Sequence, residues 1–349
     1  MARICINGTF LSEKRTGIYR FAEEIIKAMD SFVDRGAVAL VVPPKTTIPF
    51  DLKNIKVVEF GFKKGLLWEQ TFFALYLWIH HAIALNLCNV TPILAPRGYS
   101  VIHDISYKVN PQYFNHFYGK LSRKWHCFQY WVITRFSRHI FTVSEFSKME
   151  IMKVYGMTQD RITVTPNAWQ HMLSIEASPQ ESINKFGLLP DNYFLSLSTI
   201  APNKNLKWVL NAAKNNPSDT FAIAGSLNPT RFGIDLNVKS LKNVKFLGYV
   251  SDEDFVMLAK NCKAFIFPSF YEGFGLPPLE AMSVGAKVIA SDIPVLKEVF
   301  KDSAFYVNPY KASLDINALL AKKTSNTNVV LNRFNWFKSV EVMNKCFHI

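Results

Sequence analysis

The chain has 349 residues, 49% of them hydrophobic and 19% charged, which is enough apolar material for two packed domains. Its formal net charge of +13 favours an anionic partner: phosphorylated substrates, an anionic membrane surface or nucleic acid. Five scattered cysteines without a C-x-x-C pair argue against a disulfide framework or a zinc site, and no apolar run reaches the ~18–20 residues that span a bilayer. With no signal peptide at its start, we expect a cytoplasmic protein.

Apolar strand-like runs alternate with helical segments along the chain, a pattern typical of doubly wound α/β domains. In the first half, the sequence predicts strands at residues 3–7, 38–42, 57–60, 101–102 and 140–143. Apolar residues at helical spacing predict a helix over residues 17–29. Gly17 could bring backbone N–H groups to an anion there, and a turn glycine is the alternative interpretation. No G-x-G-x-x-G follows the first strand, which argues against a dinucleotide oxidoreductase.

The second half has a more regular pattern. It predicts strands at residues 193–197, 221–224, 244–247, 264–267 and 287–290. Ser251, followed by three acidic residues, is a good N-cap for a helix, and Gly285 is a good helix end. Residues 334–343 predict a terminal helix.

Glu272 and Glu280 stand eight positions apart, after the buried strand at 264–267. Pro277 and Pro278 fit the first turn of a helix, and Gly275 allows backbone to approach a ligand. One carboxylate would lie in the loop and the other in the first helical turn, both at the carboxyl end of a sheet, where open α/β folds bind ligands. The free amides of such a helix start favour an anion such as diphosphate, and carboxylates suit sugar hydroxyls.

The run Glu272-Gly-Phe-Gly-Leu-Pro-Pro-Leu-Glu280 resembles the E-x7-E signature of retaining, nucleotide-sugar-dependent glycosyltransferases of family 4, which have the GT-B fold. Five further segments resemble the family and occur in its order: Trp68-Glu69-Gln70, Asn86-Leu-Cys-Asn89, Val101-Ile-His-Asp-Ile-Ser106, Thr142-Val-Ser-Glu-Phe-Ser147 and Pro202-Asn-Lys-Asn-Leu206. The branch that makes bacterial surface polysaccharides, with many mannosyl- and rhamnosyltransferases, is the most similar.

The resemblance implies an α/β fold of two Rossmann-like, doubly wound domains facing across a cleft, with the terminal helix crossing back to the first. The segment Val164-Thr-Pro-Asn-Ala168 is similar to the family's V-x-P-N-G linker. We therefore expect an acceptor-side domain at residues 1–168, joined by about 334–349, and a nucleotide-sugar-binding domain at 169–333.

The resemblance also implies roles for single residues. His103, Glu272 and Lys204 would be catalytic: His103 at the donor sugar, Glu272 on the sugar's hydroxyls and Lys204 at the departing diphosphate. Glu280 would bind the ribose. The remaining donor-binding residues would be Gly17, Asn203, Gly273, Phe274, Gly275 and Leu276. Supporting roles fall to Asp104, which would hold the tautomer of His103, to Ser144, which would shape the cleft or cap a helix, and to Thr199.

At two positions the chain departs from its relatives. Asn203 stands where the family commonly has an arginine, and Thr199 where some members have another. A missing guanidinium would weaken diphosphate binding, unless Arg231 or Arg20 supplies the cation.

Residues 105–144 contain no acidic residue but several cations and aromatic rings, including Lys120, Lys124, Tyr113, Trp125 and Trp131. This mixture suits docking on an anionic membrane. A core role for the rings is the main alternative, and nucleic-acid binding is a weaker one.

The sequence therefore predicts a retaining glycosyltransferase that moves a hexose, preferably mannose or rhamnose, from a nucleoside diphosphate, preferably GDP. The acceptor would be a lipid-linked glycan of O-antigen, capsule or exopolysaccharide synthesis, on the inner face of the cytoplasmic membrane. No metal or other cofactor is expected, and no nucleic-acid partner. The alternatives are an epimerase or phosphorylase of the same fold, and a non-catalytic sugar-nucleotide-binding subunit of a polysaccharide synthase.

Overall fold

The computed structural model describes residues 3–12, 17–197, 201–225 and 241–347. The chain divides into two compact units. Unit 1 contains residues 1–167 and 335–349, and unit 2 contains residues 168–334. The division lies one residue before the boundary expected at 168/169. Each unit is described by itself.

Unit 1 is built on a parallel sheet of seven strands in the order β3-β2-β1-β4-β5-β6-β7. The strands are β1 (Ile4–Asn7), β2 (Val38–Val42), β3 (Lys56–Glu59), β4 (Ile83–Asn86), β5 (Tyr99–Val101), β6 (His139–Thr142) and β7 (Ile162–Val164). After β3 the chain returns to place β4 on the other side of β1. The switch point of this sheet therefore lies between β1 and β4.

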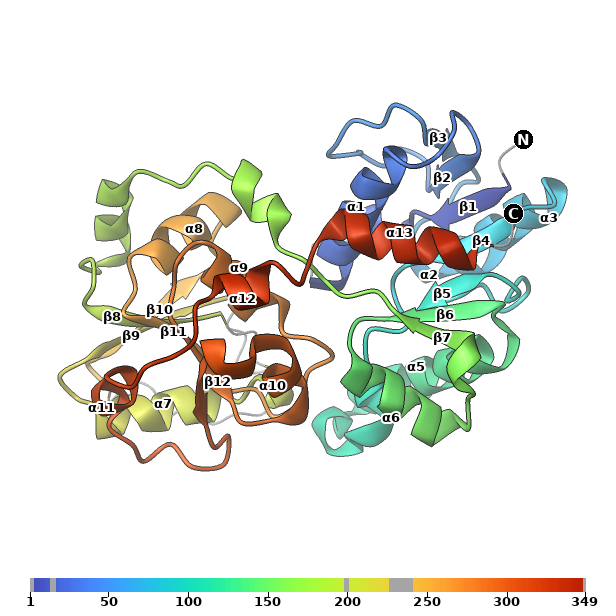
Figure 1. Cartoon of the computed structure of the whole chain (residues 1–349). Helices are drawn as coiled ribbons and strands as arrows, with labels where there is room; N and C mark the ends of the chain where they lie inside the picture. Colours follow the sequence, from blue (N-terminus) through green and yellow to red (C-terminus); the bar gives the residue numbers. More distant parts are fainter. Residues whose placement is uncertain (1–2, 13–16, 198–200, 226–240, 348–349) are drawn as a thin grey trace. The chain divides into compact units, whose positions relative to one another are not determined.

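Helices cover both faces of this sheet (Figure 1). They are α1 (Gly17–Asp30), α2 (Gly65–Trp68), α3 (Ala74–Ile79), α4 (Ser106–Val109), α5 (Phe117–Phe136), α6 (Glu145–Tyr155) and α13 (Trp336–Cys346). The predicted terminal helix is α13, and it packs beside α1 in unit 1, which confirms that the chain crosses back. The rings of Phe21 and Trp336 meet edge to face at 5.9 Å, and Ser339 Oγ donates to the carbonyl of Pro166 at 2.8 Å.

Unit 2 repeats the architecture with six parallel strands in the order β10-β9-β8-β11-β12-β13. They are β8 (Tyr193–Leu197), β9 (Thr220–Ala224), β10 (Val244–Gly248), β11 (Ala264–Phe267), β12 (Val288–Ser291) and β13 (Phe305–Val307). Its helices are α7 (Leu206–Asn215), α8 (Asp252–Lys260), α9 (Leu276–Ser283), α10 (Pro294–Phe300), α11 (Ile316–Leu320) and α12 (Asn328–Leu331), again on both faces (Figure 1). The switch point of this sheet lies between β8 and β11.

Two doubly wound parallel sheets confirm the predicted fold class. The sequence prediction missed β4, β7 and β13, which have four, three and three residues. Runs this short carry little strand signal of their own, and pairing with a neighbouring strand decides them. The predicted N-cap is confirmed, since Ser251 Oγ accepts from Asp254 N–H at 3.2 Å at the start of α8.

Within the described residues, none of the helices combines the length and the apolar character needed to cross a bilayer. The five cysteines are all free thiols.

Candidate functional site

Two loops of unit 2 meet at the switch point of its sheet. The loop after β8 contains the short 3₁₀ helix η7 (Pro202–Lys204), and the loop after β11 leads into α9. Asn205 joins them, since its Nδ2 donates to the carbonyl of Pro268 at 2.9 Å. The same Nδ2 donates to the carbonyl of Pro309, in the loop after β13, at 2.8 Å. Phe270 N–H donates to the Asn203 carbonyl at 2.8 Å. These bonds fix the loop that carries Lys204 against the loop that carries Glu272.

Asn205 has a left-handed backbone, with φ of 54°. Asparagine tolerates this conformation better than most residues, and its buried amide satisfies two carbonyl groups at once. The sequence prediction gave Asn205 no role. It does lie in the segment Pro202-Asn-Lys-Asn-Leu206 that resembles the family, and this was the signal that could have identified it.

Lys204 and Glu272 form an ion pair in the space between these loops. Lys204 Nζ lies 2.7 Å from Glu272 Oε1 and 5.2 Å from the centre of the Phe267 ring. Both side chains are largely buried, so each charge is partly removed from water and depends on the other. The structure thus brings together two of the three residues expected to be catalytic.

Glu280 lies on α9 in the second helical turn, one turn later than expected. Its Oε1 is 2.8 Å from Nε2 of His171, a residue of unit 2 that the sequence prediction missed. His171 is itself buried, and the hydrogen bond fixes the orientation of the Glu280 carboxylate. Because His171 precedes Glu280 by more than a hundred residues, no local motif could have linked them.

The start of α9 supplies backbone donors rather than side chains. Gly275, with φ of 104°, lets the loop turn into the helix, and an added Cβ would lie 2.7 Å from Leu296 Cδ2. Pro277 and Pro278 remove two N–H groups from the first turn, so this helix start offers fewer donors than an ordinary one. The Phe274 ring packs against Phe334 at 5.1 Å, so only the backbone of Phe274 is available to a ligand.

His103 lies in unit 1, just after β5, and is 5% exposed. Its ring nitrogen Nε2 lies 2.9 Å from the carbonyl of Leu87, and its ring meets Phe21 edge to face at 4.8 Å. Burial lowers the pKa of His103 to about 4, although the bond to Leu87 acts in the opposite direction. At neutral pH the ring is therefore uncharged, donates from Nε2 and can accept a hydrogen bond at Nδ1.

The expected role of Asp104 is wrong. The Leu87 carbonyl, and not the Asp104 carboxylate, holds the tautomer of His103. Asp104 Oδ1 instead accepts from Ser106 N–H at 2.8 Å, at the start of α4. Although Asp104 directly follows His103 in the sequence, its carboxylate accepts from a nearby backbone N–H and not from the His103 ring.

The other predicted site residues have simpler surroundings. Ser144 caps α6, since its Oγ accepts from Ser147 N–H at 3.0 Å. Gly17 is the first residue of α1, and an added Cβ would meet no described atom within 4 Å. Gly273 lies directly after Glu272, and Leu276 is the first residue of α9. Thr199 and Arg231 lie outside the described residues. Arg20 lies on α1 of unit 1.

Asn203 does not replace the family's arginine as a cation. Its carbonyl accepts from Phe270 N–H, and its Nδ2 makes a long, 3.5 Å contact with the carbonyl of Tyr271. It therefore holds the two loops together. Among the residues that the structure describes, no three His, Cys, Asp or Glu side chains are grouped closely enough to hold a metal ion.

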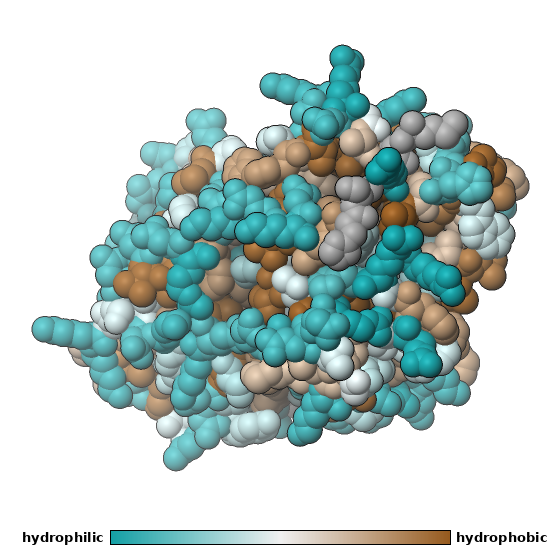
Figure 2. All heavy atoms as spheres, turned by 45° about the vertical axis from the view of Figure 1, so that its right-hand side comes forward, coloured by the Kyte–Doolittle hydropathy of each residue, from teal (hydrophilic) through white to brown (hydrophobic). Residues whose placement is uncertain are grey.

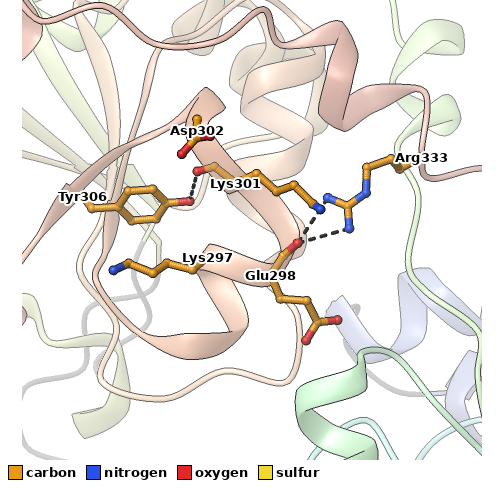
Figure 3. Close-up of a pocket in the computed structure, with 6 residues that line it drawn as sticks. All are labelled: Lys297, Glu298, Lys301, Asp302, Tyr306 and Arg333. Carbon is orange, nitrogen blue, oxygen red and sulfur yellow. Dashed lines mark hydrogen bonds between the residues drawn. The ribbon is translucent and has the colours of Figure 1, made fainter.

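A hollow of about 460 Å³ in unit 2 has a structural role (Figure 3). It lies where α10 ends and β13 begins, at the amino end of that strand. Arg333 donates to the carbonyls of Glu298 and Val299 at the last turn of α10, and the Tyr306 hydroxyl donates to the Lys301 carbonyl at 2.5 Å. Its polar groups thus stabilise a helix end, and it lies away from the Lys204–Glu272 pair.

Known proteins resemble this chain in sequence and in fold. Residues 179–335 match the family model "Glycosyl transferases group 1". The O-antigen chain mannosyltransferase B of Escherichia coli is 35% identical over 193 residues, which are 52% of this chain and 49% of that protein. The matched part spans between about a quarter and a half of the length of the curated relatives.

Solved structures cover nearly the whole chain. Sucrose-phosphate synthase from Thermosynechococcus elongatus has a TM-score of 0.73 at 14% identity, covering 99% of this chain and 98% of that one. HepE of Anabaena, solved with UDP-glucose, has a TM-score of 0.72 at 17% identity, covering 98% of each. These similarities show that the fold is that of the GT-B glycosyltransferases.

The buried histidine of unit 1 predicts how stability depends on pH. The pKa of His103 is lower in the folded than in the unfolded chain, so its contribution is complete above pH 6.5 and is lost as the pH falls toward 4. Replacing it as His103→Gln, whose amide can donate to the same carbonyl, should reduce the loss of unfolding free energy between pH 7 and 4.5 by about 2–3 kcal/mol. Urea unfolding at several pH values measures this. If the unfolding free energies of the wild type and His103→Gln fall equally between pH 7 and 4.5, the lowered pKa of His103 is contradicted.

Proposed function

We propose that this chain, whose residues 179–335 form a glycosyl transferases group 1 domain, transfers a hexose from a nucleoside diphosphate sugar to a glycan acceptor. The observation that carries the proposal is the Lys204–Glu272 ion pair at the switch point of the unit 2 sheet, beside Glu280. A cation suits a diphosphate and a carboxylate suits sugar hydroxyls, and here the two are 2.7 Å apart. A ligand in which a diphosphate is followed directly by a sugar fits this arrangement.

In the proposed complex, Lys204 binds the diphosphate and Glu272 accepts hydrogen bonds from the sugar. Glu280, oriented by His171, accepts from the ribose hydroxyls. Backbone N–H groups around Gly275 add donors without charge. The diphosphate displaces the Glu272 carboxylate from Lys204. The carboxylate oxygens of Glu272 then accept hydrogen bonds from the sugar hydroxyls. Each charge thus exchanges one partner for another on binding, so neither is left unpaired.

The proposed reaction is a transfer with retention at the anomeric carbon. The bond between that carbon and the diphosphate oxygen breaks, and the acceptor oxygen forms its bond on the same face. The acceptor's proton passes to the departing diphosphate, which serves as base. Lys204 stabilises the negative charge that develops on the diphosphate. His103 of unit 1 is uncharged at neutral pH, so it offers a neutral acceptor at Nδ1 rather than positive charge.

For the substrates we propose mannose or rhamnose carried by GDP, and a lipid-linked glycan as acceptor. Support comes from the relatives, which include O-antigen mannosyltransferases of Escherichia coli and Salmonella typhimurium. A nucleotide-sugar donor also agrees with the UDP-glucose bound to HepE.

Removing either partner of the ion pair should abolish most transfer. Glu272→Gln keeps the shape of the side chain but removes its charge, and Lys204→Met removes the cation. We expect each to lower kcat by roughly 10²–10³-fold, the usual effect of losing one group that stabilises a transition state. Release of nucleoside diphosphate, with and without a lipid-linked acceptor, measures this.

Lys185→Met is the matched control, because Lys185 pairs with Asp254 at 2.7 Å on the outer surface of the same unit. Near wild-type turnover of Glu272→Gln would contradict the site. Release of nucleoside diphosphate that is equally fast without acceptor would instead favour an epimerase or a hydrolytic reaction.

We further propose that unit 1 docks on an anionic membrane through the outer face of α5. Phe117 and Tyr118 are each 77% exposed, and Leu121, Phe128 and Trp131 continue an exposed stripe at helical spacing. Three exposed cations of α5 are interspersed with this stripe: Lys120, Lys124 and Arg135. The helix has no acidic residue, so its charge complements anionic lipids.

The rings of residues 105–144 do not all belong to this surface. Tyr130 is fully buried, as the core interpretation of these rings predicts, and Trp125 is half-buried and lines a hollow of unit 1. The rings of Phe128 and Trp131 stack at 5.9 Å on the exposed face. Figure 2 shows one face of the molecule, on which hydrophobic side chains occur in separate groups among hydrophilic ones.

Membrane docking predicts binding that depends on both lipid charge and salt. The chain should sediment with vesicles containing phosphatidylglycerol but not with pure phosphatidylcholine, and less so at high salt. Lys120→Glu with Lys124→Glu should lower the bound fraction several-fold, while Lys185→Met in unit 2 should not. Equal binding to both kinds of vesicle, or none to either, would contradict the proposal.

A further inference from the structure

Arginines stand where strands of the unit 1 sheet begin. Arg3 directly precedes β1, Arg97 lies two residues before β5, and Arg138 directly precedes β6. Because the strands of this sheet are parallel, these residues share one edge, which we call the amino edge. All three side chains are exposed, and none of them pairs with a carboxylate within the part of the chain that the structure describes.

The strand order brings these arginines close together. β1, β4, β5 and β6 are consecutive neighbours, and neighbouring strands lie about 4.8 Å apart, so the edge from β1 to β6 is roughly 14 Å long. Arg138 Nε donates to the Arg97 carbonyl at 3.2 Å, which holds these two residues beside each other. The turns that lead into β4, β5 and β6 contain no acidic residue. Asp34 and Asp160 stand before the outer strands β2 and β7, so the centre of the amino edge is cationic.

The backbone of the amino edge is fixed by hydrogen bonds between neighbouring strand starts. Ile83 N–H donates to the Arg3 carbonyl at 2.9 Å, and Arg138 N–H donates to the Gly98 carbonyl at 2.8 Å. An added Cβ at Gly98 would lie 2.5 Å from the Ala84 carbonyl oxygen, so the turn before β5 packs tightly against β4. These backbone groups are already satisfied, and a partner is therefore recognised by the side chains of the edge.

Exposed apolar side chains stand beside the cations, on the face of the sheet that α3 and α5 cover. Both helices end at the amino edge, because β4 and β6 follow them after short turns. Ala95 packs against the core cluster that contains Leu77, so the loop before β5 lies against α3. Four large apolar residues at these helix ends and in this loop are each between 42% and 60% exposed: Trp78, Ile79, Leu94 and Phe136. Apolar side chains gathered at one place on a surface, with a polar rim, mark an interaction site.

The composition of the amino edge favours a protein as its partner. Arginine and tryptophan are enriched at the energetic centres of protein interfaces, where lysine is depleted. The cations of this edge are arginines, whereas the membrane face proposed for α5 carries Lys120 and Lys124. A guanidinium binds a carboxylate through two parallel hydrogen bonds, which an ammonium group does not form. Ile79 and Leu94 offer no ring for stacking on a nucleobase, so nucleic acid fits this surface less well.

The direction in which the amino edge faces separates it from the proposed membrane face. Tyr130 and Ile133 of α5 pack in a core cluster with Ile102 and Ile140, so α5 lies on a face of the sheet. A bilayer that contacts the outer side of α5 lies alongside the strands, whereas the amino edge faces along them. One flat membrane therefore does not cover both surfaces, and the amino edge stays open to another partner.

We infer that the amino edge of the unit 1 sheet binds an acidic segment of a partner protein, in which apolar residues stand between the carboxylates. Arg97 and Arg138 bind carboxylates of this segment, and Trp78, Leu94 and Phe136 contact its apolar side chains. An extended chain advances about 3.3 Å per residue, so about five residues span the edge. The surface takes no part in bond making, and the inference goes beyond the proposed transfer without depending on it.

Fluorescence anisotropy with a synthetic peptide tests the inference on the full chain. The probe is a labelled peptide that repeats Glu-Leu-Glu-Ser, and its two references replace every glutamate by glutamine or every leucine by serine. We expect the probe to bind at least about tenfold more tightly than either reference, because it alone carries both features. Arg97→Glu with Arg138→Glu should weaken binding of the probe by about tenfold or more. Arg97→Lys with Arg138→Lys should weaken it several-fold, because the charge remains and the planar fork is lost.

Lys120→Glu with Lys124→Glu is the matched control, since it changes the net charge by the same amount on the outer side of α5. It should leave binding of the probe nearly unchanged and lower binding to phosphatidylglycerol vesicles, whereas the two Arg→Glu changes should do the reverse. Trp78→Ser with Leu94→Ser, at two exposed positions, should weaken the probe several-fold and serves as a second variant if the arginine variant fails to fold.

Three results would overturn the inference. The first is a probe that binds no more tightly than its glutamine reference. The second is equal weakening of the probe by the arginine and the lysine variants, which would show attraction to net charge alone. The third is single-stranded DNA or phosphatidylglycerol vesicles that depend on Arg97 and Arg138 more strongly than the probe does. None of these results bears on transfer by the Lys204–Glu272 site, whose failure would be seen in turnover and not in peptide binding.

Discussion

The contact between Lys204 and Glu272 is the interaction on which the interpretation of this protein depends. It joins residues 68 positions apart at a distance of 2.7 Å, in a place where each charge is only partly hydrated. Such a pair forms only if the two loops are held together. The Asn205 amide does this by donating to the Pro268 carbonyl, and Phe270 N–H by donating to the Asn203 carbonyl. The loops are thus organised before any ligand arrives, which lowers the entropy that binding costs.

Both units use the same architectural rule. In unit 2, the Lys204–Glu272 pair lies where β8 and β11 diverge, and in unit 1 the hollow with Glu69 lies where β1 and β4 diverge. At such points the chain leaves neighbouring strands in opposite directions and exposes their carboxyl ends. In unit 2 the carboxylate of Glu272 pairs with Lys204, and in unit 1 the amide of Gln70 donates to the carboxylate of Glu69.

Local sequence patterns predicted the features that local forces determine. The long apolar runs became strands, Ser251 became an N-cap, and the glycines and prolines before Glu280 marked the start of α9. These outcomes depend on hydrophobic periodicity, capping and backbone preference within a few residues. The doubly wound fold followed from the alternation of the elements.

Long-range partners could not be predicted in the same way. His171 beside Glu280, the Leu87 carbonyl beside His103, and Asn7 beside Asn86 are all brought together by the packing of distant segments. The sequence assigned Asp104 to His103 because the two are adjacent, and the structure shows that a residue sixteen positions away is the true partner. Short strands such as β4 and β13 were missed for the same reason, since their pairing is not local.

Calorimetric titration of matched ligands tests the central claim most directly. GDP carries the diphosphate alone, and GDP-mannose carries the diphosphate and the sugar. The account predicts that Lys204→Met weakens binding of both ligands, whereas Glu272→Gln weakens only GDP-mannose, by about tenfold, and leaves GDP unchanged or tighter. Equal effects of the two substitutions on both ligands, or no effect of either, would contradict it.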